Sequence, residues 1–423
     1  MTFKFEWNEF ADQPHNVAPR EERLKHHLKH ARSYFTLISA NFRRAIPILK
    51  LYRRYWKNIY KASVSLGAPF AVSVSPTGER DDEVIENLKA TGVRQTLVRV
   101  PSWEKNKLAR YEDFLKRLRR EQFDVTLALL QRRDDVVSLP SWVRFLEDVF
   151  SGLAAFSSSI EVGHAWNRTK WGVWDYTEYL DLALPAVDLA KRHGVKLVGP
   201  AVIDFEFHLY PPTLRVLPFD KVSSLLYVDR QGAPEKTQFG WDISRKIALL
   251  KAVVDASAQG SRDIWITEVN WPLQGTGKFS PASGRPNVTE EEQADYLVRY
   301  FVLCLATGMI EKVFWWQLVA PGYGLIDSRQ TVWRRRPSFR AFQTMVQVLD
   351  QSVFKGNNES GEGRFFFFSK GQDTLAVCWT AGAPFEFLFP GQVKRILGRD
   401  GLEKSFSSGR IMIEGSPIYV FFS

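Results

Sequence analysis

The sequence predicts an α/β fold, namely a (β/α)8 (TIM) barrel with a small C-terminal antiparallel β domain and an N-terminal basic helical arm. Three observations support this fold: eight apolar, β-branched runs in the middle of the chain, helix-like stretches between most of them, and short alternating runs after about residue 350. We expect the arm over residues 1–62, the barrel over 63–350 and the β domain over 351–423. A doubly wound open sheet is the structural alternative. No glycine-rich phosphate loop follows the first run, which weakens a dinucleotide-binding interpretation.

The predicted barrel strands recur at regular intervals, separated by segments with helical periodicity. The stretch before the last strand has Thr289 and Glu292 at capping-box spacing and ends at Gly308, as expected of a helix. The eight runs are PFAVSVSP (69–76), QTLVRVP (95–101), DVTLALL (124–130), SIEVG (159–163), VKLVGPAV (195–202), VSSLLYV (222–228), DIWITEV (263–269) and KVFWWQL (312–318).

The composition is that of a folded protein with a large core. Of the 423 residues, 45% are hydrophobic and 25% are charged. The two cysteines, Cys304 and Cys378, stand in apolar surroundings, which indicates buried thiols in a reducing compartment. The N-terminus resembles no secretory signal, and no uncharged apolar run is long enough to span a bilayer. We therefore expect a cytoplasmic protein, peripheral at the inner membrane if the arm binds lipid.

Within the predicted arm, residues 20–61 carry a charge equal to the net charge of the whole chain. Between Arg20 and Lys61, twelve Lys and Arg residues are opposed only by Glu21 and Glu22, which leaves +10. Basic and apolar residues alternate there in a roughly helical rhythm that we expect to break at Pro47. Such a segment suits an anionic membrane surface, while the alternative is an arm packed on the barrel with a solvated basic face. Nothing specific indicates nucleic-acid binding.

Polar side chains gather where the predicted strands end, which is where barrels place their chemistry. Carboxylates beside aromatic rings suit a carbohydrate, because sugar rings stack on indoles while carboxylates bond hydroxyl groups and stabilise a cationic transition state. We expect a carbohydrate ligand, and the residues at these strand ends are Arg99, His164, Trp166, Asn167, Lys170, Asp204, Glu206, Tyr227, Asp229, Glu268, Trp271, Trp315 and Gln317.

Alternation along the seventh run predicts which residues face the barrel interior. In IWITEVNW, Ile264, Ile266 and Glu268 share one face, so we expect the isoleucines to fill the barrel and Glu268 to lie at its mouth. Arg99 and Tyr227 are placed to orient Glu268, which is a candidate nucleophile. The alternative is a structural ion pair between Glu268 and Arg99 at the barrel rim.

Several of these segments resemble a known clan. ITEVNW resembles the nucleophile strand of the retaining (β/α)8 glycoside hydrolases, in particular their β-xylosidase and α-L-iduronidase branch. LVRVP resembles the second strand with its active-site arginine. KVFWWQLVAPGYGLID resembles the eighth strand with its tryptophan platform, and RIMIEGSPIYVFF resembles the closing strands of the β domain. The resemblance covers roughly residues 68–423 and implies a glycosidase whose nucleophile is Glu268.

The same resemblance exposes a missing acid. The clan's fourth strand ends in Trp-Asn-Glu-Pro-Asn, and on IEVGHAWN the position of the acid/base Glu falls at Ala165. Glu161 lies on the same face but about 13 Å deeper, which is farther than the roughly 5–9.5 Å between paired catalytic carboxyls. We therefore expect the proton to come from Asp204, Glu206, Asp229 or His164. The alternative role for His164 is to hold a sugar hydroxyl.

Two functions remain open from the sequence. The first is a glycoside hydrolase or transglycosidase with Glu268 as nucleophile, His164 or Asp204 as partner, and the other strand-end residues binding substrate. The second is a degenerate barrel that binds a glycan without cleaving it, in an envelope-polysaccharide pathway at the membrane surface. Arg168 and Lys170 suit an anionic sugar. We expect no cofactor and no metal, because HHLKH lacks a supporting carboxylate shell.

Overall fold

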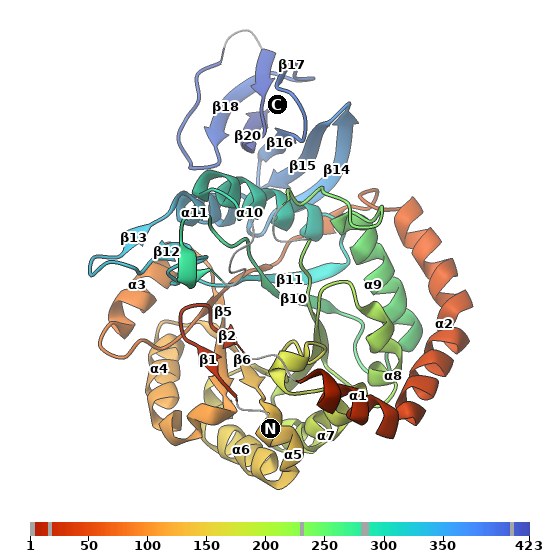
Figure 1. Cartoon of the computed structure of the whole chain (residues 1–423). Helices are drawn as coiled ribbons and strands as arrows, with labels where there is room; N and C mark the ends of the chain where they lie inside the picture. The colour runs from red at the N-terminus through yellow and green to blue at the C-terminus, as the bar shows by residue number, and fades with distance from the viewer. Residues whose placement is uncertain (1–4, 16–18, 229–231, 281–286, 407–409) are drawn as a thin grey trace.

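Eight parallel strands close into a barrel in the computed structural model, which describes residues 5–15, 19–228, 232–280, 287–406 and 410–423. Each strand pairs with its neighbour in chain order, and the last pairs with the first, so the predicted (β/α)8 fold class is confirmed (Figure 1). The barrel strands are β4 (Phe70–Val74), β5 (Gln95–Pro101), β6 (Asp124–Leu130), β7 (Ser159–Val162), β8 (Lys196–Ile203), β9 (Lys221–Leu225), β10 (Ile264–Val269) and β11 (Ile310–Trp315).

Helices form a ring around the barrel (Figure 1). The predicted capping box starts α10, where Glu292 N donates to Thr289 Oγ1 over 3.0 Å and Thr289 N donates to Glu292 Oε2 over 2.7 Å. The helices are α3 (Asp81–Ala90), α4 (Leu108–Arg120), α5 (Arg133–Val137), α6 (Leu139–Gly152), α7 (Tyr176–His193), α8 (Tyr210–Leu214), α9 (Ile243–Ser257), α10 (Glu290–Leu305) and α11 (Pro337–Leu349). Short 3-10 turns are Ser102–Lys107, Ala154–Phe156, Thr169–Trp171, Gly277–Phe279 and Phe207–Leu209.

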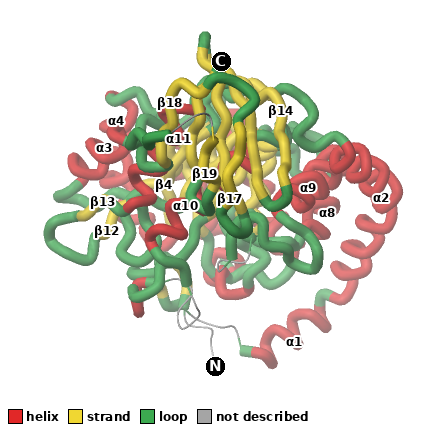
Figure 2. The backbone as a smooth tube through the Cα atoms, turned by 90° about the horizontal axis from the view of Figure 1, so that it is seen from above, coloured by secondary structure: helices red, strands yellow, loops and turns green. Residues whose placement is uncertain are grey.

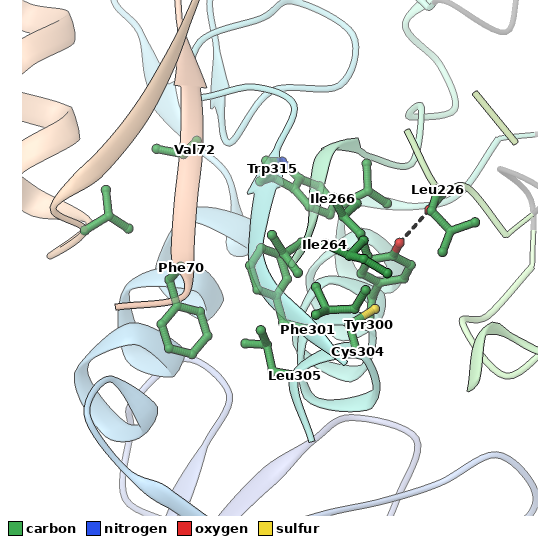
Figure 3. Close-up of a cluster of buried hydrophobic side chains, with 14 of the residues drawn as sticks. Phe70, Val72, Leu226, Ile264, Ile266, Tyr300, Phe301, Cys304, Leu305 and Trp315 are labelled. Carbon is green, nitrogen blue, oxygen red and sulfur yellow. Dashed lines mark hydrogen bonds between the residues drawn. The ribbon is translucent and has the colours of Figure 1, made fainter. Parts of the chain in front are cut away.

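The face assignment predicted for β10 is wrong. Ile264 and Ile266 point outward and pack against α10, as Figure 3 shows, whereas Trp265 faces the barrel interior. Parallel strands are buried on both faces, so apolar residues occupy both sides and alternation does not identify the inner one. A register shift between Ile266 and Val269 interrupts the alternation, and Glu268 still reaches the mouth.

The C-terminal residues form antiparallel sheets, as their alternating pattern predicts. The larger sheet has the order β18-β20-β16-β15-β14-β3, so β3 (Val64–Ser65), which precedes the barrel, pairs with β14. The domain boundaries remain a prediction, and β3 ties the start of the predicted barrel segment to the β domain. The other strands are β14 (Val353–Ser360), β15 (Gly363–Lys370), β16 (Asp373–Thr380), β17 (Phe385–Leu388), β18 (Val393–Gly398), β19 (Arg410–Ile413) and β20 (Ile418–Phe422); β12 (Ile326–Asp327) pairs with β13 (Arg334–Arg335).

The N-terminal segment has two parts. Strands β1 (Trp7–Asn8) and β2 (Gln13–Pro14) form a hairpin over the barrel mouth. Helix α1 (Arg20–Lys29) lies near the start of α7, and helix α2 (Ala31–Lys57) runs along the outside beside α8 and α9 (Figures 1 and 2).

The break expected at Pro47 is wrong, because α2 continues through it. Proline has no N–H to donate to the carbonyl of Arg43, so the helix lacks one hydrogen bond there. Water can bond this carbonyl instead, because the turn is exposed. No helix among the described residues is long and apolar enough to cross a membrane.

Candidate active site at the carboxyl ends of the barrel strands

A cavity of about 560 Å³ opens at the carboxyl ends of the strands, where the sequence predicts the chemistry. Residues of β5, β8 and β10 and of the segments after β7, β8, β9, β10 and β11 line it, together with the N-terminal hairpin. The predicted site residues that line the cavity are Arg99, His164, Lys170, Asp204, Glu206, Tyr227 and Glu268.

Glu268 is the buried carboxylate of this cavity, and two donors hold it. Tyr227 Oη donates to Glu268 Oε1 over 2.5 Å, and Arg99 Nη2 donates to Glu268 Oε2. The ring of Trp316 lies against the Arg99 guanidinium, 3.3 Å from its carbon. The three predicted partners Arg99, Tyr227 and Glu268 are therefore brought together, with the carboxylate fixed at both oxygens.

His164 shares the same arginine. Arg99 Nη2 lies 3.0 Å from His164 Nε2, and Nε2 is 3.4 Å from Glu268 Oε2. Burial, with the positive charge of Arg99 adding to it, holds the pKa of His164 well below its usual value. The imidazole is therefore neutral near pH 7, and Nε2 accepts from Arg99, which leaves its ring proton on Nδ1.

Ala165, where the sequence resemblance predicts the loss of an acid, lies in a closed corner of the cavity. Ala165 is fully buried, with a positive φ of 42°. Glu161, on the strand below it, is only 1% exposed and accepts from Thr267 Oγ1 over 2.7 Å. Burial raises the pKa of Glu161 to about 7, so below that pH it holds a proton deep inside the barrel.

Asp204 and Glu206 lie on the rim but are joined by one arginine. Arg168 Nη2 donates to Asp204 Oδ2 over 2.7 Å, and Arg168 Nη1 donates to Glu206. Asn167 Nδ2 donates to Glu206 Oε2 over 2.9 Å. Arg168 therefore carries two carboxylate partners, which makes it a poorer partner for an anionic sugar than the sequence indicates. The other predicted cation, Lys170, bonds Gln13 Oε1 over 2.5 Å.

Several predicted binding residues do not line the cavity. Trp166 stacks on Tyr179 at 4.6 Å in the core, and Trp315 stacks on Trp271 at 6.1 Å. Neighbouring tryptophans, Trp316 and Trp171, face the cavity instead, because adjacent residues of a strand or loop point in different directions.

Two polar residues also lie beside the cavity and not in its wall. Asn167 Nδ2 donates to Ile203 O and to Glu206 Oε2 and so holds the loop after β8. Gln317 contacts Ser75 and Tyr323. Asp229 lies outside the described residues.

The N-terminal hairpin supplies a site residue that the sequence analysis missed. Asp12 Oδ2 accepts from Arg99 Nη1 over 3.1 Å, and Arg99 Nη1 also lies 3.3 Å from the backbone oxygen of Asp12. Burial raises the pKa of Asp12; Arg99 opposes the rise, while the charge of Glu268 adds to it. No local motif marks Asp12, because its partner is 87 residues away in the chain.

One cluster outside the cavity has metal-ligand residue types. Among the described residues, ligand atoms of His26, His30 and Asp175 lie within 4.8 Å of one another, so the fold brings a carboxylate to HHLKH. However, the two imidazoles stack at 4.1 Å with 16° between their planes. An ion bound by an imidazole lies in the plane of its ring, and two stacked rings share no such nearby point. We therefore infer no metal there.

Known proteins resemble this chain in fold. No protein-family model and no curated protein sequence matches this chain. A family 39 glycoside hydrolase from the gut symbiont Bacteroides cellulosilyticus WH2 matches with a TM-score of 0.67 and 15% identity, over 84% of this chain and 81% of that chain. A GH30 endoxylanase from Clostridium papyrosolvens C71 matches at 0.58 and 11%, over 86% and 98%. A GH51 arabinofuranosidase from Xanthomonas axonopodis pv. citri matches at 0.51 and 11%, over 86% and 97%.

The fold is thus the (β/α)8 barrel that these glycoside hydrolases also have. At these identities the likeness concerns the fold, and the chemistry has to be argued from the residues of the cavity.

Proposed function

We propose that the protein is a glycoside hydrolase or transglycosidase in which Glu268 is the nucleophile. The observation that carries the proposal is that Arg99 and Tyr227 each donate a hydrogen bond to one oxygen of Glu268, which lines the cavity. Two donors orient the carboxylate toward an anomeric carbon and stabilise its charge. A rim ion pair alone has no need of the tyrosine or the open volume, so this arrangement favours catalysis over a structural role.

The cavity also offers contacts for a sugar. Trp316 and Trp171 present aromatic surface, and Asp204, Glu206 and Lys170 present polar groups along the rim. We propose a bacterial-type polysaccharide or glycolipid as the substrate, in agreement with the sequence resemblance to the β-xylosidase and α-L-iduronidase branch.

The contacts of Glu268 suit a nucleophile, but those of the proton donors predicted from the sequence do not suit a donor. His164 Nε2 accepts from Arg99 and so has no proton to give in this geometry. Asp204 and Glu206 both form ion pairs with Arg168 on the rim, apart from the Arg99 guanidinium that holds Glu268. These contacts favour a proton donor elsewhere in the cavity.

A panel of activated aryl glycosides and fluorosugars tests the function. Wild type is expected to turn over at least one glycoside, and Glu268→Gln to lower kcat/KM by about 1,000-fold or more. A 2-fluoro glycosyl fluoride is expected to leave a covalent sugar on the peptide that contains Glu268, detected by mass spectrometry. Glu311→Gln is a matched control, because Glu311 belongs to the amino-terminal half of β11, away from the cavity.

One result would overturn this proposal in favour of its alternative. If no glycoside is cleaved or transferred and no covalent sugar forms, while glycans still bind, the protein is a degenerate glycan-binding barrel.

We also propose that the arm binds an anionic membrane surface, at the cytoplasmic face of the inner membrane. Five large apolar side chains of α2 are 47% to 81% exposed, and they fall within an arc of about 80° on the helix. The opposite face of α2 packs on α8 and α9, so the exposed face has no partner among the described residues. The exposed residues are Phe35, Ile38, Phe42, Ile46 and Leu49, which we call the α2 stripe.

Charge selects a membrane over a second copy of the chain as the partner. Arg32, Arg43 and Lys50 flank the α2 stripe, and residues 20–61 together carry +10. Two such arms repel each other, whereas anionic lipid attracts basic residues and accepts the apolar stripe. Sedimentation with anionic liposomes tests this contact, and an acidic protein partner without lipid binding would overturn it.

A further inference from the structure

We propose that the N-terminal hairpin completes the active site and that the carboxyl group of Asp12 is the acid/base that the loop after β7 lacks. This inference rests on the proposed glycosidase function. Alanine at position 165 has no proton to transfer, and in this proposal a segment outside the barrel performs that transfer instead.

The hairpin is anchored firmly enough to act as part of the site. Trp7 packs on Trp103 with 4.8 Å between ring centroids and on Trp171 with 5.9 Å. Asn8 Oδ1 accepts from the backbone nitrogens of the turn that follows, at 3.1 and 3.2 Å. At the end of this turn Asp12 has a φ of 50°, a left-handed conformation that an aspartate tolerates. The aromatic packing and the turn together hold Asp12 over the cavity.

A single guanidinium group sets the distance between Asp12 and Glu268. Arg99 donates through Nη1 to Asp12 and through Nη2 to Glu268. Two hydrogen bonds of about 3 Å joined through one guanidinium limit the separation of the carboxyl oxygens to roughly 8 Å. This limit is compatible with the about 5–5.5 Å of a retaining pair and with most of the about 6.5–9.5 Å range of an inverting pair. Asp12 thus meets the distance requirement for a catalytic carboxyl pair with Glu268.

The surroundings of Asp12 suit an acid. Its side chain is 24% exposed and lines the cavity, so a substrate can reach it. Burial raises its pKa, Arg99 opposes this, and the charge of Glu268 adds to the rise. The described carboxyl groups that line the cavity are Asp12, Asp204, Glu206 and Glu268. Asp204 and Glu206 share Arg168 on the rim, whereas Asp12 shares with Glu268 the guanidinium of Arg99, which places Asp12 as its partner.

The reaction balances with these two carboxyl groups in a retaining mechanism. Glu268 attacks the anomeric carbon while the glycosidic C–O bond breaks, and Asp12 gives its proton to the leaving oxygen. The product of this step is a glycosyl ester on Glu268. A water or acceptor hydroxyl then attacks the anomeric carbon, Asp12 takes its proton, and the ester bond to Glu268 breaks. Asp12 ends protonated and Glu268 ends as a carboxylate, as at the start.

Asp12→Asn and Asp12→Ala test the inference with two substrates that differ only in their leaving group. With a poor leaving group, kcat/KM is expected to fall by about 100- to 10,000-fold, because protonation is required. With an activated leaving group, kcat/KM is expected to change little. In wild type, activity falls as pH rises through the pKa of Asp12, and Asp12→Asn is expected to remove this limb. Azide added to Asp12→Ala is expected to restore turnover and give a glycosyl azide.

Matched controls separate this inference from the glycosidase proposal. Glu6→Gln neutralises an exposed carboxyl group on the same hairpin and is expected to leave all rates unchanged. Equal loss on both substrates, with an unchanged pH profile and no glycosyl azide, would assign Asp12 to substrate positioning and overturn the inference while leaving Glu268 as nucleophile. A wild type that neither cleaves nor forms a covalent sugar overturns both proposals.

Discussion

Glu161 is a protonated carboxyl group inside the barrel, and it makes the stability of the protein depend on pH. It is 1% exposed, its pKa is raised from 4.5 to about 7 by burial, and it accepts a hydrogen bond from Thr267. Between about pH 4.5 and 7 the unfolded chain loses this proton while the folded chain keeps it. The free energy of unfolding therefore falls as pH rises through this window, by about 3 kcal/mol in total, and is flat above it.

Glu161→Gln removes this pH dependence, because an amide does not ionise. From pH 4.5 to 7, wild type is expected to lose about 3 kcal/mol of unfolding free energy relative to Glu161→Gln. Urea titration at each pH measures this difference. Exposed Glu147→Gln serves as the control for the loss of a carboxyl group. Parallel curves for wild type and Glu161→Gln would contradict a buried, protonated Glu161.

At the scale of elements, helix α2 has apolar residues on two opposite faces. One face packs on the barrel helices, and the α2 stripe faces solvent. Sequence periodicity indicates an amphipathic arm, but it gives no means to tell the face that meets the barrel from the face that stays exposed. Docking on α9 settles this: Tyr55 Oη donates to Asp255, and Tyr52 packs on Trp241 at 5.1 Å.

Removal of two aromatic rings from the α2 stripe is expected to weaken membrane binding strongly. Each fully buried phenylalanine contributes about 1.5–3 kcal/mol, so Phe35→Ser combined with Phe42→Ser is expected to lower the partition coefficient at least about 100-fold. Liposome sedimentation at low and high salt measures this, and salt is expected to weaken the binding that remains. The pair Val332→Ser and Leu402→Ser, which removes exposed apolar residues elsewhere, is the control. Equal sedimentation of both double variants would contradict the proposed contact.

At the scale of the whole molecule, the barrel and the β domain share one core. Trp379 of β16 is fully buried, stacks on Phe366 at 5.2 Å and donates to Glu235 Oε1 over 2.6 Å. Glu235 in turn accepts from Arg299 of α10. Because β3 also pairs with β14, the chain enters the barrel from the sheet and returns to it, which couples the two parts.

This coupling predicts a single cooperative thermal transition. Trp379→Ala is expected to destabilise the protein by about 3–5 kcal/mol and to lower the melting temperature of barrel and β domain together, as measured by calorimetry. Leu388→Ala, at an exposed position of the same domain, is the control and is expected to change the melting temperature little. Two separate transitions, of which Trp379→Ala shifts one, would contradict a shared core.

Local pattern was sufficient for much of the fold. The eight barrel strands, the capped helix before β11 and the antiparallel C-terminal strands follow from the spacing of apolar, capping and turn residues, which reports on neighbours a few positions apart. The position of Glu268 at a strand end could also be predicted, because strand ends converge in any closed parallel barrel.

The sequence by itself therefore determined the barrel, the charge of the arm and the placing of Glu268 at a strand end. Only the tertiary structure decided that Trp316 faces the cavity in place of Trp315, that Arg168 neutralises the rim, and that Asp12 meets Arg99. The physical reason is range. Arg99 binds Glu268 across 169 residues and Asp12 across 87, and such contacts depend on how the barrel closes and where the N-terminal segment packs.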